Sequence, residues 1–505
     1  MILSIDQGTT STRAIVYQLP DFQVVGTFAN EIQQYYPAPG WVEHDAEEIW
    51  QSVAHTVGEA IARAGCSSTD LTTIGITNQR ETIVIWDATT GKPVGPALVW
   101  QDRRTTTYCA ERQKDDPWLT AKTGLRSDPY FSASKLAWMI GQYQLRSTLE
   151  RRQCLVGTID SFLLWRLTGG QVHATDITNA CRTLLCNIQT GQWDQELADY
   201  FGIPLQALPA IHPSAGHFGN TANLGFLPAG IPISGIAGDQ QAALYGHGLE
   251  QAGFAKCTYG TGAFMLLHTG KQRPISKTGL LTTVAATANG ELNYALEGNI
   301  YIAGAAIQWL RDALHLYTRS DETENLAQES NPDEPIVHVP AFVGLGAPYW
   351  QANTNGAIFG ITRSTSIADF TRATLEGVAH QVADLCLACE QDTGSALQRL
   401  SVDGGMARNL WFLTRQADLL GIPITPAISH ETTALGAAML AGYAQGLCPT
   451  STTIAAQQGQ STVIEPTWST PQRTHHRRVW QAAIEAVIGY TQAIQLPPPV
   501  TAGNN

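Results

Sequence analysis

A strand that runs into a turn of glycine and hydroxyl residues occurs early in each half of this chain. In the first half, the strand-like residues 1–5 lead into the turn Asp6-Gln-Gly-Thr-Thr-Ser-Thr12, and a second strand is expected at 13–18. In the second half, Phe254–Tyr259 lead into the turn Gly260-Thr-Gly262. The letters themselves do not repeat, so we interpret this recurrence as a distant duplication of one strand-rich unit.

Strand-like and helical segments alternate along the chain. Residues 44–64 carry apolar side chains at the spacing of an amphipathic helix, and strands are expected at 71–77 and 82–87. This alternation predicts an α/β architecture. Because 505 residues exceed what one hydrophobic core accommodates, we expect two domains, at 1–247 and 248–505, with a cleft between them.

The composition is that of a globular protein, with 44% hydrophobic and 14% charged residues. A formal net charge of −13 argues against nucleic acid as a partner, because a phosphate backbone needs a basic face. We expect neither a secretory signal nor a membrane span, since no apolar run is long enough. Nine scattered cysteines are typical of a reduced, cytoplasmic protein, and the pair Cys386 and Cys389 fits a buried helix better than a metal site.

The two glycine-rich turns are candidate phosphate-binding loops. None of the seven lysines lies in a G-x-x-x-x-G-K-[ST] motif, which excludes a Walker-type site. Glycine nevertheless lets backbone N–H groups approach an anion, and the hydroxyls donate further hydrogen bonds. Arg13 would supply positive charge, and Asp6, at a strand end, is placed to bind Mg²⁺ through water. The alternative is that both segments are ordinary hairpin turns.

A third turn, Val402-Asp-Gly-Gly-Met-Ala-Arg-Asn409, follows a strand-like segment and precedes a predicted helix. Its glycines would let an adenosine or an α-phosphate lie against the backbone at the helix start. A helix that is simply capped by a turn accounts for the same residues.

The segment Thr77-Asn-Gln-Arg-Glu-Thr82 places polar side chains at a strand end. In an extended chain Arg80 and Glu81 point to opposite sides, so each needs a partner elsewhere. A small polyol satisfies both, because arginine donates to hydroxyls and glutamate accepts from them. The alternative is an exposed turn with two solvated charges. Trp100, Tyr130 and Phe264 adjoin polar clusters and would form an apolar wall for a small triol, unless they are ordinary core residues.

Asp239 is the candidate general base. It ends the apolar run Ile233–Gly238 and is followed by Gln240 and Gln241, so we expect it to face the cleft. A carboxylate there would accept the proton of a hydroxyl that attacks a γ-phosphate. The alternative is an aspartate that only caps the following helix.

Several of these motifs together resemble the carbohydrate kinases named for the FGGY motif, over about residues 1–490. The most specific stretches are Asp6-Gln-Gly-Thr-Thr-Ser-Thr-Arg13, Asn78-Gln-Arg-Glu-Thr82, Val99-Trp-Gln-Asp-Arg-Arg104, Gly238-Asp-Gln-Gln-Ala-Ala243, Tyr259-Gly-Thr-Gly262, Gly344-Leu-Gly-Ala-Pro-Tyr-Trp350 and Glu431-Thr-Thr-Ala-Leu-Gly-Ala437. Within the family, the Asn-Gln-Arg-Glu-Thr motif favours glycerol over five- and six-carbon substrates.

The resemblance implies two actin-like (ribonuclease H-type) domains with an interdomain catalytic cleft, and ATP-dependent phosphorylation of glycerol with Mg²⁺. It implies glycerol contacts from Arg80, Glu81, Tyr130, Asp239 and Gln240, with Trp100 and Phe264 on the apolar side. It also implies nucleotide contacts from Thr9, Thr10, Ser11, Arg13, Thr261, Gly304, Gln308, Gly405 and Asn409. Asp239 would be the base, and we expect a homo-oligomer, either a dimer or a tetramer.

Two rival interpretations remain open. One is a kinase of the same family that acts on another polyol or a ketose. The other is an actin- or chaperone-like binding protein that is driven by nucleotide and phosphorylates no small molecule. Fold cannot separate these, whereas the site can. The combination of Arg80, Glu81, Tyr130 and Asp239 speaks against the second.

Overall fold

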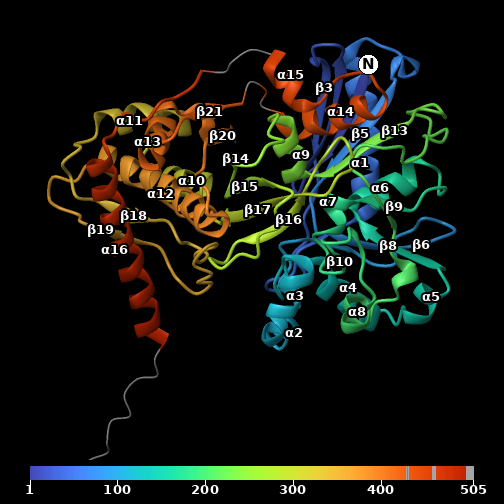
Figure 1. The fold of residues 1–505 in the computed structure, drawn as a ribbon, viewed down its shortest axis with the longest axis horizontal. Coiled ribbons are helices and arrows are strands. Elements are labelled where there is room, and N and C mark those ends of the chain that lie inside the picture. Colours follow the sequence, from blue (N-terminus) through green and yellow to red (C-terminus); the bar gives the residue numbers. More distant parts are fainter. Residues whose placement is uncertain (428, 430, 458–461, 496–505) are drawn as a thin grey trace, which may run out of the picture.

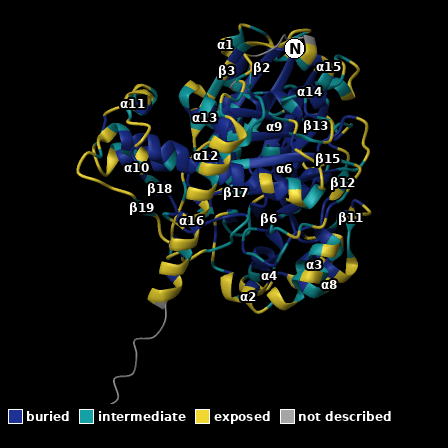
Figure 2. Ribbon diagram, turned by 60° about the vertical axis from the view of Figure 1, so that its left-hand side comes forward, coloured by how far each residue is buried: buried dark blue, intermediate teal, exposed yellow. Residues whose placement is uncertain are grey.

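The computed structural model describes residues 1–427, 429, 431–457 and 462–495. Two α/β lobes, each built around its own sheet, lie side by side (Figure 1). The buried strands of both sheets form the interior, and much of the long C-terminal helix is exposed (Figure 2). Within this described part, no helix is long and apolar enough to cross a membrane.

The first sheet has the order β13-β5-β1-β2-β3. Its hairpin pairs β1 with β2 in antiparallel fashion, as the sequence predicted; β5 pairs with β1 in parallel, and β13 pairs in parallel with β5. Its strands are β1 (Ile2–Gln7), β2 (Ser11–Gln18), β3 (Gln23–Glu31), β5 (Thr73–Asn78) and β13 (Ile233–Gly238).

The second sheet repeats this plan, in the order β16-β17-β15-β14-β20-β21. An antiparallel hairpin again begins it, and β20 and β21 follow in parallel on the other side of β14. The duplication inferred from the two turns is therefore confirmed in the topology. The strands are β14 (Phe254–Tyr259), β15 (Ala263–Gly270), β16 (Leu281–Ala285), β17 (Asn293–Ile300), β20 (Arg399–Gly404) and β21 (Ile424–Pro426).

Smaller sheets and helices complete the first lobe. The four-stranded sheet β4-β7-β6-β8 contains the strand expected near 82–87. Its strands and the short pairs are β4 (Glu43–His44), β6 (Ile83–Asp87), β7 (Ala97–Leu98), β8 (Cys154–Thr158), β9 (Ala174–Asp176), β10 (Cys186–Asn187), β11 (Gln192–Trp193) and β12 (Ala210–His212). The helices are α1 (Ala46–Ala64), α2 (Thr106–Ala110), α3 (Asp116–Thr123), α4 (Ser132–Gln142), α5 (Arg146–Glu150), α6 (Ile159–Leu167), α7 (Ile177–Ala180), α8 (Gln195–Phe201) and α9 (Asp239–Gly246).

The predicted helix at 44–64 is α1, and its ends follow from local chemistry. The Asp45 side chain accepts from the N–H of Glu47 and so caps the first turn. Gly65, at φ 63°, ends the helix in a left-handed conformation that costs glycine little. The buried face carries Ile49, Val53 and the other apolar residues whose spacing predicted it, and it packs on β2 and β3.

The second lobe is mainly helical outside its sheet. Its helices and its remaining strand pair are α10 (Gly304–Asp312), α11 (Thr323–Glu329), α12 (Ile367–Thr393), α13 (Leu410–Leu420), α16 (Thr470–Gln495), β18 (Val337–Val339) and β19 (Ala357–Phe359). Cys386 and Cys389 are buried, free thiols on α12, as expected for a buried helix. Among the described residues, no cluster of three or more histidine, cysteine or carboxylate side chains is placed to hold a metal.

A late segment of the chain returns to the first lobe. Helix α14 (Thr432–Ala444) packs on α9, β13, β5 and β1, with α15 (Ser451–Gln457) beside it (Figure 1). Helix α14 can lie close to the sheet because glycines of β5 and β13 face the helix. A Cβ on Gly75 or Gly235 would collide with the backbone at Ala437. The chain therefore crosses back to the first lobe soon after β21, and α14 completes the packing of the first sheet.

Trp480 anchors helix α16 on α12, and replacing this tryptophan should destabilise the protein. Its indole is 1% exposed, stacks on His380 with ring centroids 4.9 Å apart, and donates from Nε1 to Asp384 at 2.8 Å. We expect Trp480→Ala to lower the free energy of unfolding by about 3–5 kcal/mol, as large core truncations do. Chemical denaturation measures this, with Tyr490→Ala, 66% exposed on the same helix, as the control. A Trp480→Ala variant as stable as that control would contradict the assignment.

Candidate active site

The segment that follows β5 carries the first two predicted site residues, and both are buried. Arg80 is 3% exposed and Glu81 1%, so the alternative of an exposed turn with solvated charges is wrong. The expectation that the two side chains point to opposite sides is also wrong, because the chain there is not extended. Glu81 has φ 61°, and the N–H of Thr82 donates to the carbonyl of Arg80. This turn brings Arg80 Nε within 4.0 Å of Glu81 Oε1.

Two charged residues that the sequence did not single out lie against this pair. Glu297, on β17 of the second sheet, accepts from Arg80 Nη1 at 2.6 Å and from Nη2 at 3.0 Å. Arg182, just after α7, donates to Glu81 at 2.6 Å and to Glu297 at 2.9 Å. No local pattern predicted these partners, because each is separated from Arg80 by about a hundred residues or more of chain.

Asp239 begins α9 and reaches the same cluster. Its Oδ1 lies 3.1 Å from Arg80 Nε and accepts from the backbone N–H of Gln240 at 2.7 Å. The carboxyl side chain is 32% exposed, in contrast to the other charged members. Burial raises the pKa of Asp239, while Arg80 and Lys256 act in the opposite direction. Asp239 therefore combines a fixed orientation with access to solvent, which a general base needs.

The three predicted aromatic residues come together beside this cluster. The ring centroid of Trp100 lies 5.6 Å from that of Tyr130 and 6.2 Å from that of Phe264. Tyr130 is 3.5 Å from Arg80 through its hydroxyl, and Trp100 Nε1 donates to the Thr9 hydroxyl at 2.9 Å. The aromatic wall thus connects the charged cluster to the first glycine-rich turn.

Lys256, on β14, is a further buried charge that the sequence did not suggest. Its ammonium donates to the side-chain oxygen of Gln240 and to the Thr258 hydroxyl. Burial lowers the pKa of Lys256, and the nearby Asp403 partly offsets that effect. Lys256 therefore holds the side-chain amide of the predicted substrate residue Gln240 in place.

The predicted residues of the first glycine-rich segment lie on β1 (Asp6), in the turn (Thr9 and Thr10) and on β2 (Ser11 and Arg13). The N–H of Gly8 donates to the Ser11 carbonyl and closes the turn between β1 and β2. Arg13 forms an ion pair with Glu431, a partner that the sequence did not suggest. Burial and the nearby charge of Asp239 together raise the pKa of Asp6 to about 7, although Arg13 opposes them.

A cavity of about 520 Å³ in the second lobe collects the other predicted nucleotide residues. Its walls come from the β14–β15 turn, the start of α10, α11 and the segment after β20. The predicted residues that line it are Thr261, Gly304, Gln308, Gly405 and Asn409. Asn409 also caps α13, because its side chain accepts from the N–H of Phe412. The third turn is therefore a helix start that also forms the wall of a cavity.

Glycines shape this cavity in two ways. Gly404 has φ 89°, and a Cβ there would collide with the backbone of Tyr259. A Cβ on Gly405 would meet nothing within 4 Å, so that position opens onto free space. A nucleotide can therefore approach the backbone at Gly405, while Gly404 is required by the fold itself.

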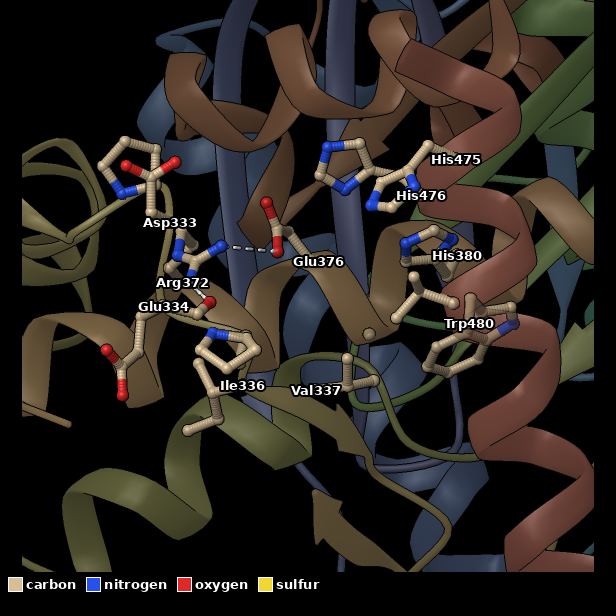
Figure 3. Close-up of a pocket in the computed structure, with 15 residues that line it drawn as sticks. Asp333, Glu334, Ile336, Val337, Arg372, Glu376, His380, His475, His476 and Trp480 are labelled. Atoms are coloured by element: carbon tan, nitrogen blue, oxygen red, sulfur yellow. Dashed lines mark hydrogen bonds and ion pairs between the residues drawn. The ribbon is translucent and has the colours of Figure 1, made fainter. Parts of the chain in front are cut away.

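A second cavity, of about 380 Å³, lies between α12, α16 and the segment before β18 (Figure 3). Arg372 and Glu376 pair along its wall on α12, with Nη1 and Oε2 3.4 Å apart, and His380 of α12 lies against Trp480 of α16. None of the predicted site residues lines it. It marks the junction between helices rather than the predicted site.

The raised pKa of Asp6 predicts a gain in stability when its charge is removed. With the unfolded pKa near 3.8 and the folded pKa near 7, the ionised group destabilises the fold increasingly as pH rises from about 4 to about 7. Each pKa unit corresponds to about 1.4 kcal/mol, so Asp6→Asn should stabilise the protein above pH 7 by up to about 4 kcal/mol. Melting temperatures at pH 5 and pH 8 measure this, and equal effects at both would contradict it.

Comparison with known proteins shows the family of this chain. The N-terminal domain model of the FGGY family of carbohydrate kinases matches residues 1–246, and its C-terminal domain model matches residues 255–445. The chain belongs to this family. It is thus an enzyme, a kinase with the family's two-domain actin-like fold, and not a nucleotide-driven binding protein that lacks catalysis.

Curated relatives extend the likeness over nearly the whole chain. A glycerol kinase of Nitrobacter hamburgensis is 47% identical over 493 residues, which are 96% of this chain and 98% of the relative. A glycerol kinase of Brucella ovis is 50% identical over 453 residues, 89% and 91% of the two chains. The crystal structure of Plasmodium falciparum glycerol kinase with ADP has a TM-score of 0.91 at 34% identity and covers 96% of this chain and 98% of that one.

Proposed function

We propose that this kinase transfers the γ-phosphoryl group of ATP to glycerol, giving sn-glycerol 3-phosphate. The observation that carries the proposal is the cluster of Arg80, Tyr130, Trp100 and Asp239, which offers charged hydrogen-bonding groups on one side and an aromatic wall on the other. A triol has hydroxyls for the first and carbon atoms for the second. The curated glycerol kinases support the choice of substrate.

In this proposal the site residues divide into three roles. Arg80, Glu81, Tyr130 and Gln240 hold the hydroxyls, and Trp100 and Phe264 cover the carbon chain. Asp239 accepts the proton of the attacking hydroxyl. The nucleotide is held by the cavity residues Thr261, Gly304, Gln308, Gly405 and Asn409 and by the first turn, through Thr9, Thr10, Ser11 and Arg13.

Asp6 would hold Mg²⁺ together with phosphate oxygens. Magnesium favours one or two carboxylates plus phosphate, and the raised pKa of Asp6 beside Asp239 marks negative charge that a cation would relieve. When bound, the ion would neutralise charge on the transferred phosphoryl group. Occupation by Mg²⁺ should lower the pKa of Asp6, so Mg²⁺ affinity should fall as pH drops below about 7.

Two domains close on the substrates in this proposal. We divide the chain into domains at 1–247 and 248–505 and infer that they close on the two substrates, because the predicted nucleotide residues lie in both lobes. Closure excludes water, which otherwise competes with glycerol as acceptor.

We place the enzyme in the cytoplasm, in a pathway of glycerol catabolism, on the basis of its free cysteines and its substrate.

The test is a panel of alcohols in an assay for ADP release. Glycerol should give kcat/KM at least about tenfold above xylulose, ribulose, erythritol and gluconate, which corresponds to about 1.4 kcal/mol of discrimination. Mass spectrometry of the product should place one phosphate on a terminal carbon. Preference for a ketose would identify the chain as a kinase of the same family with another substrate and would refute the assignment to glycerol.

A further inference from the structure

Two of the predicted glycerol residues belong to a group of four buried charges. Arg80, Glu81, Arg182 and Glu297 are each at most 3% exposed. Only the first two belong to the substrate residues proposed above. Buried charges are costly unless they are paired, so the presence of the other two calls for a physical reason.

Glu297 is the centre of this group. Its two carboxylate oxygens accept from the two terminal nitrogens of Arg80, in a bidentate pair at 2.6 and 3.0 Å. Its Oε1 also accepts from Arg182 Nη2 at 2.9 Å. A bidentate pair fixes the plane of a guanidinium as well as its position. The remaining nitrogen of Arg80, Nε, is thereby directed at Asp239, 3.1 Å away.

Arg182 completes the arrangement from the first lobe. Through Nε it donates to Glu81 at 2.6 Å, and through Nη2 to Glu297. Burial alone would raise the pKa of Glu297, but Arg182 and Arg80 outweigh it and lower that pKa to about 2. Glu297 is therefore ionised at every physiological pH, and its charge is shared between two arginines.

Glu297 and its two arginine partners lie in different lobes. Arg80 and Arg182 belong to the first lobe, whereas Glu297 lies on β17 in the second sheet. Strand β17 ends at Ile300, four residues before Gly304, which lines the nucleotide cavity. The orientation of Arg80 is thus set by the lobe that is proposed to hold most of the nucleotide.

We infer that Glu297, assisted by Arg182, is a positioning residue for glycerol: it holds the Arg80 guanidinium in the plane that presents this side chain to the substrate. Both carboxylate oxygens of Glu297 already accept from Arg80 and Arg182, so Glu297 acts through Arg80 and not by contact with the substrate. The inference rests on the proposed role of Arg80 in binding glycerol. It adds a determinant of substrate affinity on the opposite lobe.

Steady-state kinetics of Glu297→Gln test the inference. The amide cannot form a charged bidentate pair with Arg80, and KM for glycerol should rise about 10- to 100-fold, as misplacement of a binding group typically costs. KM for ATP should stay within about twofold, since no cavity residue is altered. Glu297→Asp, which keeps the charge, should recover part of the glycerol affinity.

Glu376→Gln is the matched control. Glu376 is also a buried glutamate of the second lobe paired with two arginines, Arg372 at 3.4 Å and Arg415 at 3.1 Å, but it lies outside the predicted site. This variant should lose stability in a similar way and leave KM for glycerol unchanged. If both variants raise KM equally, the effect is general destabilisation and the inference is overturned.

A double-mutant comparison shows whether Glu297 acts through Arg80. In an Arg80→Lys background the bidentate pair is already lost, so adding Glu297→Gln should change KM for glycerol less than about threefold. If the two substitutions instead raise KM for glycerol independently, so that their fold-changes multiply, the inference is overturned. Should Glu297→Gln not fold, Arg182→Lys and Glu297→Asp allow the same comparison.

Kinetics of the wild-type enzyme distinguish failure of this inference from failure of the proposed function. If wild type phosphorylates glycerol but Glu297→Gln has normal KM, the positioning role fails and the function stands. If wild type prefers another polyol, the assignment to glycerol fails, and the same variants measured with that polyol still decide the role of Glu297.

Discussion

Replacing Asp239 with asparagine should lower kcat by about 10²–10⁴-fold, because the amide cannot accept the proton of the attacking hydroxyl. Asparagine keeps the size of the side chain and one acceptor oxygen, which can still receive the Gln240 N–H at 2.7 Å. Glycerol should therefore bind within about tenfold of its normal affinity, a change of at most about 1.4 kcal/mol. Nucleotide binding should be unchanged. Turnover, glycerol affinity and melting temperature measured on one preparation give the result.

Asp45→Asn is the matched control for this variant. Asp45 also stands at a helix start and accepts from a backbone N–H, that of Glu47 at 2.8 Å, but it caps α1 away from the cluster. Asparagine caps helices about as well as aspartate, so this change should leave both kcat and stability nearly unaltered. If a stable Asp239→Asn variant also turned over at the normal rate, Asp239 would be a helix cap, and the proton would leave directly to phosphate or water.

Replacing Arg80 with alanine should affect both affinity and stability. Loss of a charged hydrogen bond to glycerol is worth about 1.5–3 kcal/mol, or roughly a 10- to 150-fold weaker affinity. The buried carboxylates of Glu81 and Glu297 would keep only Arg182 as a partner, and breaking a buried ion pair costs about 3–5 kcal/mol. Affinity for ATP should change little. Calorimetric titration and chemical denaturation measure the two effects.

Two further variants make this result interpretable. Arg146→Ala removes an arginine that is 65% exposed and pairs with Glu150 on the surface, so it should cost less than about 1 kcal/mol and leave affinity unchanged. Arg80→Lys keeps the charge but not the planar fork, and should preserve more stability than glycerol affinity. Normal glycerol binding by folded Arg80→Ala would remove Arg80 from the site.

The local elements of the fold could be predicted because short-range patterns decide them. The hairpin of β1 and β2, the helix α1 and the strand β14 follow from alternation, helical spacing and glycine or aspartate at the ends. The candidate role of Asp239 was likewise visible, because a carboxylate at the end of a buried apolar strand must either face a cleft or cap the next helix. The sequence also indicated the duplication, since both hairpins carry the same kind of turn.

The Arg80–Glu81 segment marks the limit of such local inference. Its residue types indicated a polar site, but an extended chain was assumed, whereas Glu81 adopts φ 61°. That conformation is uncommon for a residue other than glycine and is maintained by surrounding structure. Here the surroundings are Arg182, which lies 101 residues from Glu81 along the chain, and Glu297, which lies 217 residues from Arg80.

By itself, the sequence determined which chemical groups are present and which short segments become strands, turns and helices, because backbone sterics and side-chain periodicity act over a few residues. Tertiary structure alone decided which of those groups meet. Packing of α14 on the first sheet, the gathering of Thr261, Gly304 and Gly405 around one cavity, and the pairing of Glu297 with Arg80 all join distant parts of the chain. Such contacts depend on how two sheets and their helices pack, and buried charges find partners only after that packing has brought them together.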